Sequence, residues 1–565
     1  MHFQKYPTRV GLIFFFFLFC IILFCVKLSL IQVFRSDYLA EKADKQHNHI
    51  VELEPVRGTI YDRNMRSLAL NVPAYSLFAN PRSMSLAQKD TAAQAVAKTA
   101  GGAAAAYALR MAKDKSFVWL ARKLSTEQYE ALKAQKIPGI GFVRESRRFY
   151  PNGSLAAHVI GFANIDNTGL QGVELEYDHY LRGTRGVAQF LRDARMRDLM
   201  IEKDFVAPKD GDSVVLTIDE TIQFIAEQAL QKSFEKYHAL SASVIVLDPK
   251  TGEVLAFANC PTFRPDAPEA SPIENRTNRA VAFVYEPGSV FKIVTASAGL
   301  EEGAFKEEDV IFCENGKYRV GNHILKDHEP EGNLTFRQVV EHSSNIGVTK
   351  IAQKLGPAKV YEYAHRFRFG MKTGIGMVGE VPGLLKPVSQ WSKTSIGAIP
   401  IGQEVTVTPI QLVGAIAAIA NNGRYMKPYY LKAVKDPRGN TVREFQPQSL
   451  GEVLHPDIAR RLQSILQGVV DEGTATAAKM KDITAGGKTG TAQKVVNGVY
   501  SHSKFVASFI GFAPVEDPKL AIVVTVDNPH PVYYGGLVAA PVFKEIVEDS
   551  LRYLASARRR GLPGE

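Results

Sequence analysis

An uncharged apolar segment near the N-terminus places the strongest limit on how this chain folds. No charged residue occurs from Val10 to Val26 (VGLIFFFFLFCIILFCV), and the apolar character resumes after Lys27 as LSLIQVF. Together these stretches cover about 25 residues, which is enough for a helix to cross the hydrocarbon core of a membrane. The long side chain of Lys27 can reach the lipid–water interface. The sequence therefore predicts one transmembrane helix.

The charges that flank this segment predict its orientation. Lys5 and Arg9 precede it, and positively charged residues favour the cytoplasmic side of a membrane. A cleaved signal peptide is the alternative, but its apolar region is shorter and ends at a small-x-small cleavage site. The stretch RSDYLAEKADKQ after Phe34 offers no good site of this kind. We therefore expect residues 1–36 to be a short cytoplasmic tail and an uncleaved anchor.

Composition indicates a multidomain globular protein beyond the anchor. The chain has 565 residues, of which 45% are hydrophobic and 22% charged, and its formal net charge is +10. The basic residues are spread along the chain without a nucleic-acid-binding motif, so no nucleic-acid partner is expected. No cluster of Cys, His and carboxylate residues has metal-ligand spacing, so neither a metal nor another cofactor is expected. Outside the anchor only Cys260 and Cys313 remain, and their pairing stays open.

Two regions with different patterns follow the anchor. Residues 50–210 contain short alternating strands and turns, interrupted by a helical patch at 85–111, and hold no nucleophile–base arrangement. We expect an extended β-rich module with a scaffolding role. A charged stretch rich in Pro and Gly at 207–212 is typical of a linker and ends this module.

The second region, residues 213–557, predicts an α+β domain. The stretch SASVIVLDPKTGEVLAFA is typical of a β-hairpin. Helical patterns fill the middle, and three strand patterns return before a final helix at 540–557. We expect an antiparallel sheet whose first and last strands meet, with helices packed on it. Residues 558–565 form a basic tail.

The candidate chemistry begins with Ser289 and Lys292 in the stretch EPGSVFK. The Pro-Gly turn and the apolar residues that follow predict that both side chains lie at the start of a buried helix. On a helix, residues i and i+3 share a face, so Lys292 is expected to reach the Ser289 hydroxyl. Partial burial lowers the pKa of a lysine and lets it act as a general base.

Two other Ser-x-x-Lys pairs show that this spacing alone is weak evidence. Ser233 and Lys236 are expected on the solvated face of a polar amphipathic helix. Ser501 and Lys504 are expected in a polar turn before a strand. The apolar surroundings of Ser289 distinguish it from both.

A Ser-x-Asn motif occurs once in the chain, as Ser343-Ser344-Asn345 in the stretch VVEHSSNIGVTK. It lies at a predicted helix boundary. In isolation, such a motif is more often a capping serine and a turn asparagine than a catalytic group.

Lys-Thr-Gly occurs twice. The copy at 372–374 lies among glycines without a strand pattern, whereas the copy in GGKTGTA opens a strand. Strand alternation places Thr489 and Thr491 on one side and Lys488 and Gly490 on the other. Gly490 is expected to leave room for a ligand near the backbone. The strand copy is therefore the candidate.

The order Ser-x-x-Lys, Ser-x-Asn, Lys-Thr-Gly is the signature of β-lactamases and penicillin-binding proteins. From about Arg57 to its end, the chain resembles a class B penicillin-binding protein, a membrane-anchored peptidoglycan D,D-transpeptidase with a non-catalytic pedestal domain. The resemblance is carried by RGTIYDRN, RRFYPNGSLAAHVIGFANIDNTGLQGVELEYD, DPKTGEVLAFANCPTF, EPGSVFK, HSSNIG, GQEVTVTPIQL and GGKTGTA. The stretches from the pedestal domain and GQ-x-VTP-x-QL look more like those of the cell-division, septal type than those of the elongation type.

The resemblance implies a role for each motif residue. Ser289 would be the acyl-forming nucleophile and Lys292 its base. Ser343 would relay protons to the leaving D-alanine, and Asn345 would position the substrate amide and Lys292. Lys488 would supply positive potential for the substrate carboxylate and for the proton of Ser343. Substrate binding would fall to the rest of the strand motif: Thr489, Gly490 and Thr491. The backbone N–H groups of the nucleophile and of the last threonine would form an oxyanion hole.

The resemblance also implies partners and a location. In this family, a stem peptide ending in D-Ala-D-Ala forms an acyl-enzyme that an amine of a neighbouring strand resolves, and β-lactams are trapped at the same serine. No transglycosylase domain precedes the pedestal, so strand polymerisation is expected from a SEDS-type glycosyltransferase. That enzyme and division proteins would bind through the membrane helix and pedestal. The implied location is the bacterial inner membrane, single-pass, with the catalytic domain outside.

The sequence leaves some alternatives open and disfavours others. An elongation-type transpeptidase and a catalytically inactive divisome scaffold remain open. A secreted serine β-lactamase would be about half as long and would lack a pedestal, and a β-lactam-sensing receptor would carry further membrane segments. A Ser-His-Asp hydrolase is disfavoured because no G-x-S-x-G occurs. Two places depart from the family pattern: the apolar residues in NRAVAFVYEPGS, and Cys260, where an aromatic residue is common.

Overall fold

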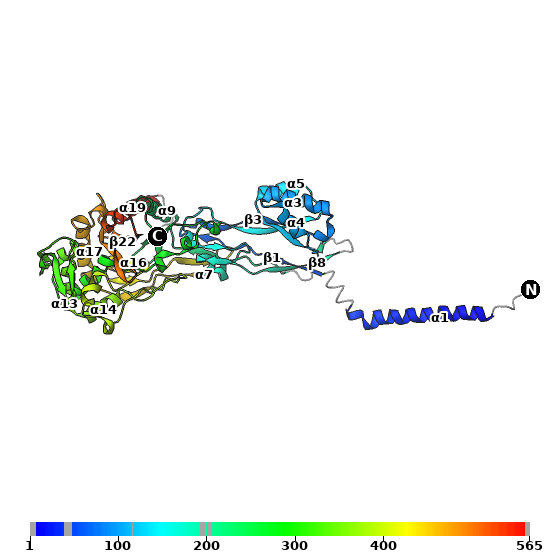
Figure 1. Cartoon of the computed structure of the whole chain (residues 1–565), viewed down its shortest axis with the longest axis horizontal. Coiled ribbons are helices and arrows are strands. Elements are labelled where there is room, and N and C mark those ends of the chain that lie inside the picture. The colour runs from blue at the N-terminus through cyan, green and yellow to red at the C-terminus, as the bar shows by residue number, and fades with distance from the viewer. Residues whose placement is uncertain (1–6, 39–47, 116, 193–197, 201–205, 560–565) are drawn as a thin grey trace, which may run out of the picture. The chain divides into compact units, whose positions relative to one another are not determined.

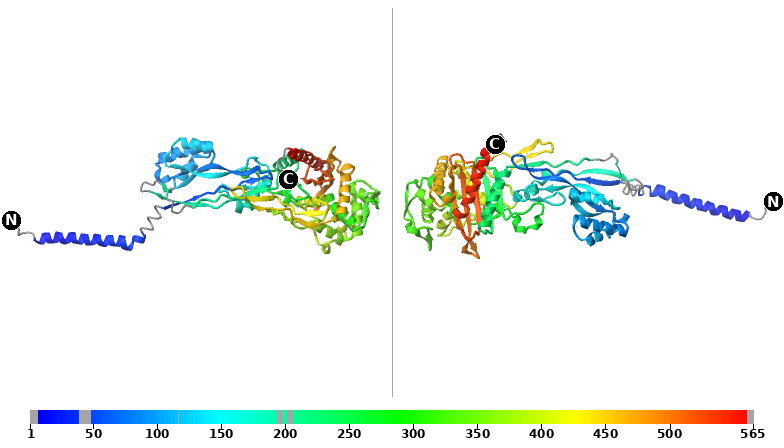
Figure 2. Two further views of the ribbon diagram at one scale, coloured as in Figure 1. Left: turned by 180° about the vertical axis from the view of Figure 1, so that it is seen from behind. Right: turned by 90° about the horizontal axis from the view of Figure 1, so that it is seen from above.

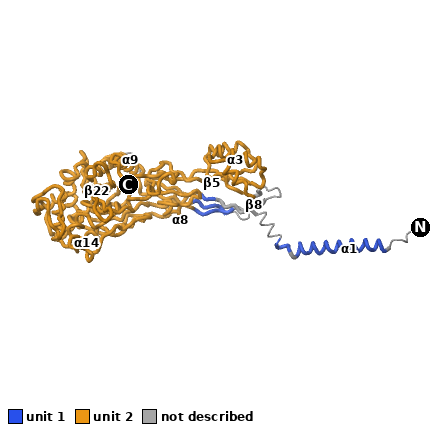
Figure 3. The backbone as a smooth tube through the Cα atoms, in the orientation of Figure 1, with its two compact units in different colours: residues 1–55, 183–210 blue, residues 56–182, 211–565 orange. Residues whose placement is uncertain are grey.

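The computed structural model describes residues 7–38, 48–115, 117–192, 198–200 and 206–559. The chain divides into two compact units, Met1–Pro55 with Gly183–Asp210 and Val56–Arg182 with Gly211–Glu565 (Figure 3). Of the predicted basic tail, residues 560–565 lie outside the described part, as do residues 1–6 of the predicted cytoplasmic tail.

The first unit contains the apolar N-terminal helix and a small sheet. Helix α1 (Pro7–Ser29) continues into a π-helical turn at Leu30–Phe34. The stretch Thr8–Val33, which runs from α1 into this turn, is long and apolar enough to cross a membrane, and its most apolar part is not buried against other residues. This helix agrees with the predicted anchor. The sheet is antiparallel, in the order β1 (Asn48–Leu53), β8 (Gly186–Arg192), β9 (Asp198–Met200).

The second unit begins with a seven-stranded sheet that draws strands from distant parts of the chain. Its order is β19 (Thr441–Glu444), β18 (Leu431–Lys435), β10 (Ser213–Leu216), β2 (Ile60–Tyr61), β3 (Ser67–Ala79), β4 (Val118–Leu124), and β5 (Ile140–Phe149) also pairs with β3. Strand β10 pairs with β2 in parallel and with β18 antiparallel. The stretch at 207–212 therefore leads into a sheet that both regions share.

Three helices cover one end of this sheet with a core of their own (Figure 1). They are α3 (Leu86–Ala100), α4 (Ala104–Met111) and α5 (Thr126–Ala134). A capping box between Ser85 and Gln88 starts α3. Gly101 and Gly102, with φ of 81° and 86°, separate α3 from α4. The helical patch predicted at 85–111 is thus two helices broken by glycines, which favour left-handed backbone.

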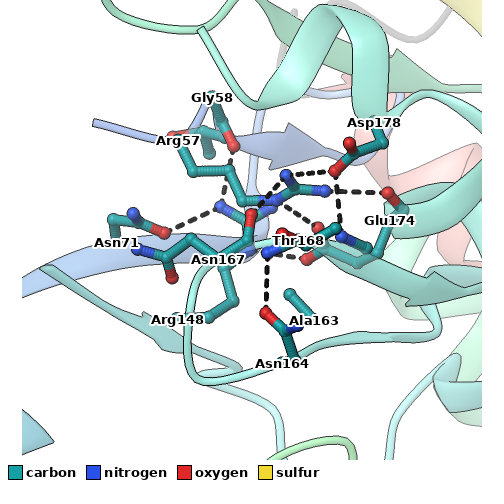
Figure 4. A network of polar contacts seen from close by, with 12 residues as sticks. Arg57, Gly58, Asn71, Arg148, Ala163, Asn164, Asn167, Thr168, Glu174 and Asp178 are labelled. Carbon is teal, nitrogen blue, oxygen red and sulfur yellow. Dashed lines mark hydrogen bonds and ion pairs between the residues drawn. The ribbon is translucent and has the colours of Figure 1, made fainter. Parts of the chain in front are cut away.

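A buried network of charged side chains ties together strands and loops of the same region (Figure 4). Arg57 is 1% exposed, and its Nε lies 2.7 Å from Glu174 Oε2. Its Nη1 lies 2.6 Å from Asp178 Oδ1, and Arg148 Nε lies 2.5 Å from Glu174 Oε1. Burying these charges is tolerated because each is paired.

A five-stranded antiparallel sheet forms the centre of the second region. Its order is β12 (Val254–Cys260), β11 (Ser241–Leu247), β23 (Leu520–Asp527), β22 (Val499–Ala513), β21 (Gly486–Val496). The predicted hairpin is β11–β12, and the predicted meeting of early and late strands is the pairing of β11 with β23. Strand β21 lies at the edge of the sheet.

Helices cover both faces of this sheet. Every residue of β11, β12 and β23 is therefore buried. Helix α16 (Pro409–Ala420) packs on β11, β22 and β23. Helices α9 (Glu220–Lys236) and α19 (Ala540–Arg559) pack on each other and on the sheet, and Figure 2 shows α19 in red against the orange strands. The α+β architecture agrees with the prediction.

The middle of the second region is helical and surrounds the candidate site. Its helices are α11 (Lys292–Glu301), α12 (Phe336–Glu341), α13 (Asn345–Leu355), α14 (Pro357–Arg366) and α17 (Pro456–Asp471). Helix α11 contacts α13, α14 and α17. Short elements complete the unit: α6 (Ala157–Ile160), α7 (Gly172–Glu176), α8 (Asp178–Leu181), α10 (Arg279–Ala282), α15 (Ser395–Ala398), α18 (Gly535–Val538), and strands β6 (Phe162–Ala163), β7 (Gly169–Gln171), β13 (Val310–Phe312), β14 (Lys317–Val320), β15 (His323–Lys326), β16 (Asn333–Thr335), β17 (Arg424–Met426) and β20 (Ser449–Glu452).

Candidate active site

Ser289 lies in a 3₁₀ turn that leads directly into α11. The turn spans Gly288–Phe291, and α11 begins at Lys292, so the helix start predicted from EPGSVFK is present. Val290 and Phe291 are fully buried and anchor the turn in the core, while Ser289 is half-buried. The arrangement holds the serine at the surface of a rigid core.

Two glycines allow other segments to lie against this turn. Gly402, with φ of 79°, has so little space that a Cβ there would lie 2.1 Å from the Gly288 carbonyl oxygen. The same pair forms a backbone hydrogen bond from Gly288 N–H to Gly402 O at 3.2 Å. A Cβ at Gly490 would lie 2.9 Å from Val290 Cγ1 and 3.0 Å from the Pro287 oxygen.

The reason for Gly490 therefore differs from the one expected. The sequence suggested room for a ligand, but the space beside this glycine is occupied by the turn that carries Ser289 and by the Ser508 side chain, whose Oγ would lie 2.5 Å from a Cβ. The glycine lets strand β21 and the Gly288–Phe291 turn approach each other closely.

The Lys292 side chain is buried and points to the Ser-x-Asn motif. It is 1% exposed, and its Nζ donates to the Ser343 carbonyl, to Ser343 Oγ at 3.1 Å and to Asn345 Oδ1 at 2.8 Å. An ammonium has three donors, and here all three have acceptors in this motif. In the described part of the chain, the Ser289 hydroxyl makes no hydrogen bond, so the direct contact expected between Ser289 and Lys292 is not formed in this state.

Lys488 lies beside Lys292 and shares one of its acceptors. It is fully buried, and its Nζ donates to Ser343 Oγ at 2.8 Å. The Ser343 hydroxyl thus bridges two amines from α11 and β21. Ser343 adopts a left-handed conformation with φ of 61°, which is uncommon for serine and costs free energy. This geometry can pass a proton from one amine to the other.

Burial lowers the pKa of both lysine amines. It lowers the pKa of Lys292 to about 7, against an opposing effect of the Asp327 carboxylate. Burial, and then the charge of Lys292, lower the pKa of Lys488 well below its usual value. Near neutral pH, a fraction of Lys292 is therefore a free amine and able to accept a proton.

Sequence reasoning missed Asp327, which contacts the Ser-x-Asn motif and the first turn of α13. Its carboxylate accepts hydrogen bonds from the Ser344 hydroxyl and from the backbone N–H groups of Asn345 and Ile346. Asp327 precedes the helix by 18 residues, so no local capping pattern reveals it. Ser344 also caps α13 by accepting from Gly347 N–H. This is the capping serine expected of such a motif in isolation.

The threonines of strand β21 are positioned by two segments that the sequence did not connect to them. Thr489 Oγ1 lies 2.9 Å from Thr474 Oγ1. Thr491 Oγ1 accepts from Gly535 N–H at 3.0 Å. Both hydroxyls thus have fixed partners at the edge of the sheet, next to the turn that carries Ser289.

The second Lys-Thr-Gly lies in a loop, as predicted. Lys372 is exposed, and Thr373 is buried, with its N–H and hydroxyl both donating to Glu380 Oε1 at 2.6 Å. Gly374 has φ of 81°, which suits a turn and not a strand. This copy is a structural loop.

The other two Ser-x-x-Lys pairs depart from the prediction. Ser233 is 5% exposed and its hydroxyl donates to the Val538 carbonyl at 3.4 Å, so the expected solvated position is wrong for it, although Lys236 is exposed. The packing of α9 on the C-terminal segment buries that face. Ser501 and Lys504 lie within β22 and not in a turn before it.

Cys260 and Cys313 are both buried and free, so they do not form a disulfide. Cys260 Sγ contacts Gln231 Oε1, and Cys313 Sγ accepts from the Ser344 hydroxyl at 3.4 Å. Within the described residues, no group of three or more His, Cys, Asp or Glu side chains is placed to hold a metal ion.

Two protein families match this chain. Residues 52–216 match the penicillin-binding protein dimerisation domain, and residues 242–548 match the penicillin binding protein transpeptidase domain.

Curated relatives match nearly the whole chain. Stage V sporulation protein D of Bacillus subtilis is 36% identical over 554 residues, covering 96% of this chain and 86% of that protein. Peptidoglycan D,D-transpeptidase FtsI of Escherichia coli K12 is 31% identical over 547 residues, covering 93% of this chain and 88% of that protein. The crystal structure of penicillin binding protein 3 from Mycobacterium tuberculosis, complexed with ampicillin, is similar with a TM-score of 0.69 and 30% identity, covering 89% of this chain and 96% of that one.

Proposed function

The chain belongs to the class B penicillin-binding proteins, which are serine-type peptidoglycan D,D-transpeptidases, and from this premise we propose that Ser289 is its acyl-forming nucleophile. The Ser289 oxygen attacks the carbonyl carbon of the penultimate D-alanine of a stem peptide. Its proton passes to the Lys292 amine, whose pKa of about 7 suits a general base near neutral pH. Placement at a helix start favours the charge that develops there.

We assign the second proton transfer to Ser343. When the bond to the terminal D-alanine breaks, the leaving amine needs a proton, and the Ser343 hydroxyl between Lys292 and Lys488 is placed to supply it. Lys488 then restores the Ser343 proton. Asn345 holds Lys292 through its Oδ1 and has the amide chemistry to orient the substrate backbone. The amine of a second strand then attacks the ester carbonyl carbon of the acyl-enzyme. Its proton passes through Ser343 to Lys488, Lys292 returns its proton to Ser289, and the ester bond breaks as the amide cross-link forms.

Substrate binding is assigned to strand β21. Its edge position leaves backbone groups for an extended peptide to pair with. The hydroxyls of Thr489 and Thr491 bind the substrate carboxylate, and Gly490 keeps the strand close to the nucleophile turn. The backbone N–H groups of Ser289 and Thr491 form the oxyanion hole, a contribution commonly worth about 3 kcal/mol of barrier.

The observation that carries this proposal is the sharing of one hydroxyl, that of Ser343, by two buried lysines next to the nucleophile turn. Such perturbed amines cluster at catalytic sites. A catalytically inactive scaffold has no need to bury two ammonium groups, whose desolvation is costly.

Labelling with a fluorescent penicillin tests the nucleophile. Ser289→Ala should abolish covalent labelling while the protein stays folded, because the hydroxyl makes no hydrogen bond in the described chain. Ser501→Ala, in the Ser-x-x-Lys pair of β22, is the matched control: Ser501 is also half-buried, and the variant should label as the wild type does. Undiminished labelling of Ser289→Ala would refute the assignment.

We further propose that the enzyme acts in septal wall synthesis, at the outer face of the inner membrane, with a SEDS-type glycosyltransferase and division proteins as partners. The similarity to FtsI and to the sporulation protein supports the division role, and the single apolar helix α1 supports the anchor. Depletion should produce filamentous cells. Round cells would instead favour the elongation type.

A further inference from the structure

Asp327 and Lys292 both contact the Ser-x-Asn motif, through different atoms of it. Asp327 Oδ2 accepts from the Ser344 hydroxyl at 2.7 Å, and Oδ1 accepts from Asn345 N–H at 2.5 Å and from Ile346 N–H at 3.0 Å. These are among the donors that a helix leaves unpaired at its N-terminus. A carboxylate there is also favoured by the helix dipole. Asp327 thereby fixes the first turn of α13.

The outer residues of the motif face Lys292. Ser343 offers its carbonyl and hydroxyl oxygens to Lys292 Nζ, and Asn345 offers Oδ1. Ser343 does so from a left-handed backbone conformation, which neighbours must hold in place because serine rarely adopts it. The hydrogen bonds that begin at the next residue, Ser344, therefore bear directly on the position of Ser343.

The Asp327 carboxylate also acts on Lys292 through its charge. It favours the ammonium form and opposes the effect of burial on the Lys292 pKa. Among the described residues, other charged or titratable groups near the motif include Lys488, which contacts Ser343 Oγ, and the Cys313 thiol, whose pKa burial raises. They also include Lys350, whose charge acts on Cys313, Lys326, whose carbonyl accepts from Asn345 Nδ2, and the Glu331–His342 pair at 2.9 Å. Of these groups, Asp327 is the one whose charge supports the ammonium of Lys292.

We propose that Asp327 is a positioning residue that holds Ser343 and Asn345 against Lys292 and whose negative charge stabilises the Lys292 ammonium. The inference rests on the proposed function, because it requires Lys292 to act as the base for Ser289. It assigns to a loop residue outside the three motifs the task of setting the pH at which the nucleophile is activated.

The test is the pH dependence of Ser289 acylation by a fluorescent penicillin, measured on the full-length protein in detergent from about pH 5.5 to about pH 8.5. In the wild type, the rate should rise with pH as Lys292 loses its proton. In Asp327→Asn, the ammonium loses its support and the Lys292 pKa falls, so the midpoint of the rise should move to lower pH. The plateau rate should fall roughly tenfold, because charged hydrogen bonds are lost.

Two variants control this experiment. Asp327→Glu keeps the charge but shifts the oxygens, so it should lower the plateau and leave the midpoint close to that of the wild type. Asp309→Asn alters an exposed aspartate that also accepts a backbone hydrogen bond, from Lys306 N–H at 2.8 Å. This control should stay within about twofold of the wild-type rate at every pH.

A fall in rate with an unmoved midpoint in Asp327→Asn would show a merely structural role and overturn the inference, as would a wild-type profile. If Asp327→Asn does not fold, as judged by its melting temperature, the Glu variant decides: a wild-type plateau overturns the proposal. These results are separate from the Ser289→Ala labelling, whose failure would refute the proposed function itself.

Discussion

At the scale of single residues, the cost of burying two lysines organises the candidate site. Lys292 and Lys488 are 1% and 0% exposed, and their amines share the Ser343 hydroxyl. Two buried ammonium groups that contact the same hydroxyl repel each other and lack water to stabilise them. One of them therefore gives up its proton near neutral pH. That free amine is the property that a serine nucleophile requires of its base.

The duplicated Lys-Thr-Gly provides an internal comparison at this scale. Lys488→Ala removes a charge-assisted hydrogen bond worth about 1.5–3 kcal/mol, so acylation by a fluorescent penicillin should slow roughly ten- to a hundredfold. Lys372→Ala alters an exposed loop residue and should change the second-order rate by less than about twofold. If both variants slowed equally, the choice of the strand copy would be wrong.

At the scale of elements, the site depends on how closely three backbone segments meet. The Gly288–Phe291 turn lies against both Gly402 and Gly490 of β21. Neither position has room for a Cβ. Gly402, the first residue of the stretch GQEVTVTPIQL, thus contributes a close backbone contact to the turn.

Gly402→Ala should disturb this meeting of segments more than an ordinary glycine substitution does. An alanine with φ of 79° is strained by about 1–3 kcal/mol, and its Cβ would also collide with the Gly288 oxygen. We expect acylation to slow by more than about tenfold and the melting temperature to fall.

Gly439→Ala is the matched control, because Gly439 has φ of 88° but nothing within 4 Å of its added Cβ. It should show the strain alone, with acylation within about twofold of the wild type. Equal acylation rates for the two variants would contradict the role given to the contact between Gly402 and Gly288.

At the scale of the whole molecule, backbone hydrogen bonds hold together adjacent chain crossings at the end of the pedestal region, next to the pairing of β2 with β10. Gly58 N–H donates to Leu181 O at 2.8 Å, Gly211 N–H to Val56 O at 2.9 Å, and Asp212 N–H to Tyr180 O at 2.9 Å. The paired charges of Arg57, Arg148, Glu174 and Asp178 lie in the same region (Figure 4). This network of the pedestal region is therefore polar and buried, and its central carboxylate is paired through both oxygens.

Glu174→Gln should destabilise this network of the pedestal region without altering the chemistry of the site. Removing the carboxylate leaves the charges of Arg57 and Arg148 buried with weaker partners, which typically costs about 3–5 kcal/mol. Unfolding by denaturant in detergent should show this loss, while acylation at Ser289 by the folded protein should stay within about twofold.

Asp114→Asn is the control for this prediction, since its pair with Arg82 is exposed, with side chains 86% and 59% accessible. It should change the free energy of unfolding by less than about 0.5 kcal/mol. A loss as large as that of Glu174→Gln would mean that burial does not determine how much these ion pairs contribute to the free energy of unfolding.

Local patterns in the sequence predicted the elements well, because they depend on near neighbours. The run from Val10 to Val26 predicted α1, the Pro-Gly turn predicted the start of α11, and strand alternation predicted β21 and its neighbours. The order of the three motifs identified the family, since the chemistry needs those residue types in one site. Gly374 and its flanking glycines correctly placed the second Lys-Thr-Gly in a loop.

Tertiary structure alone decided which groups satisfy the buried amines. The acceptors of Lys292 lie 51 and 53 residues along the chain, and Lys488 reaches Ser343 across 145 residues. Asp327, the occupant of the space beside Gly490, and the burial of Ser233 were likewise invisible to periodicity. Periodic patterns and turn residues report only on contacts a few positions apart. Contacts between distant segments depend on how whole elements pack, and it is this packing that removes water from Lys292 and lowers its pKa.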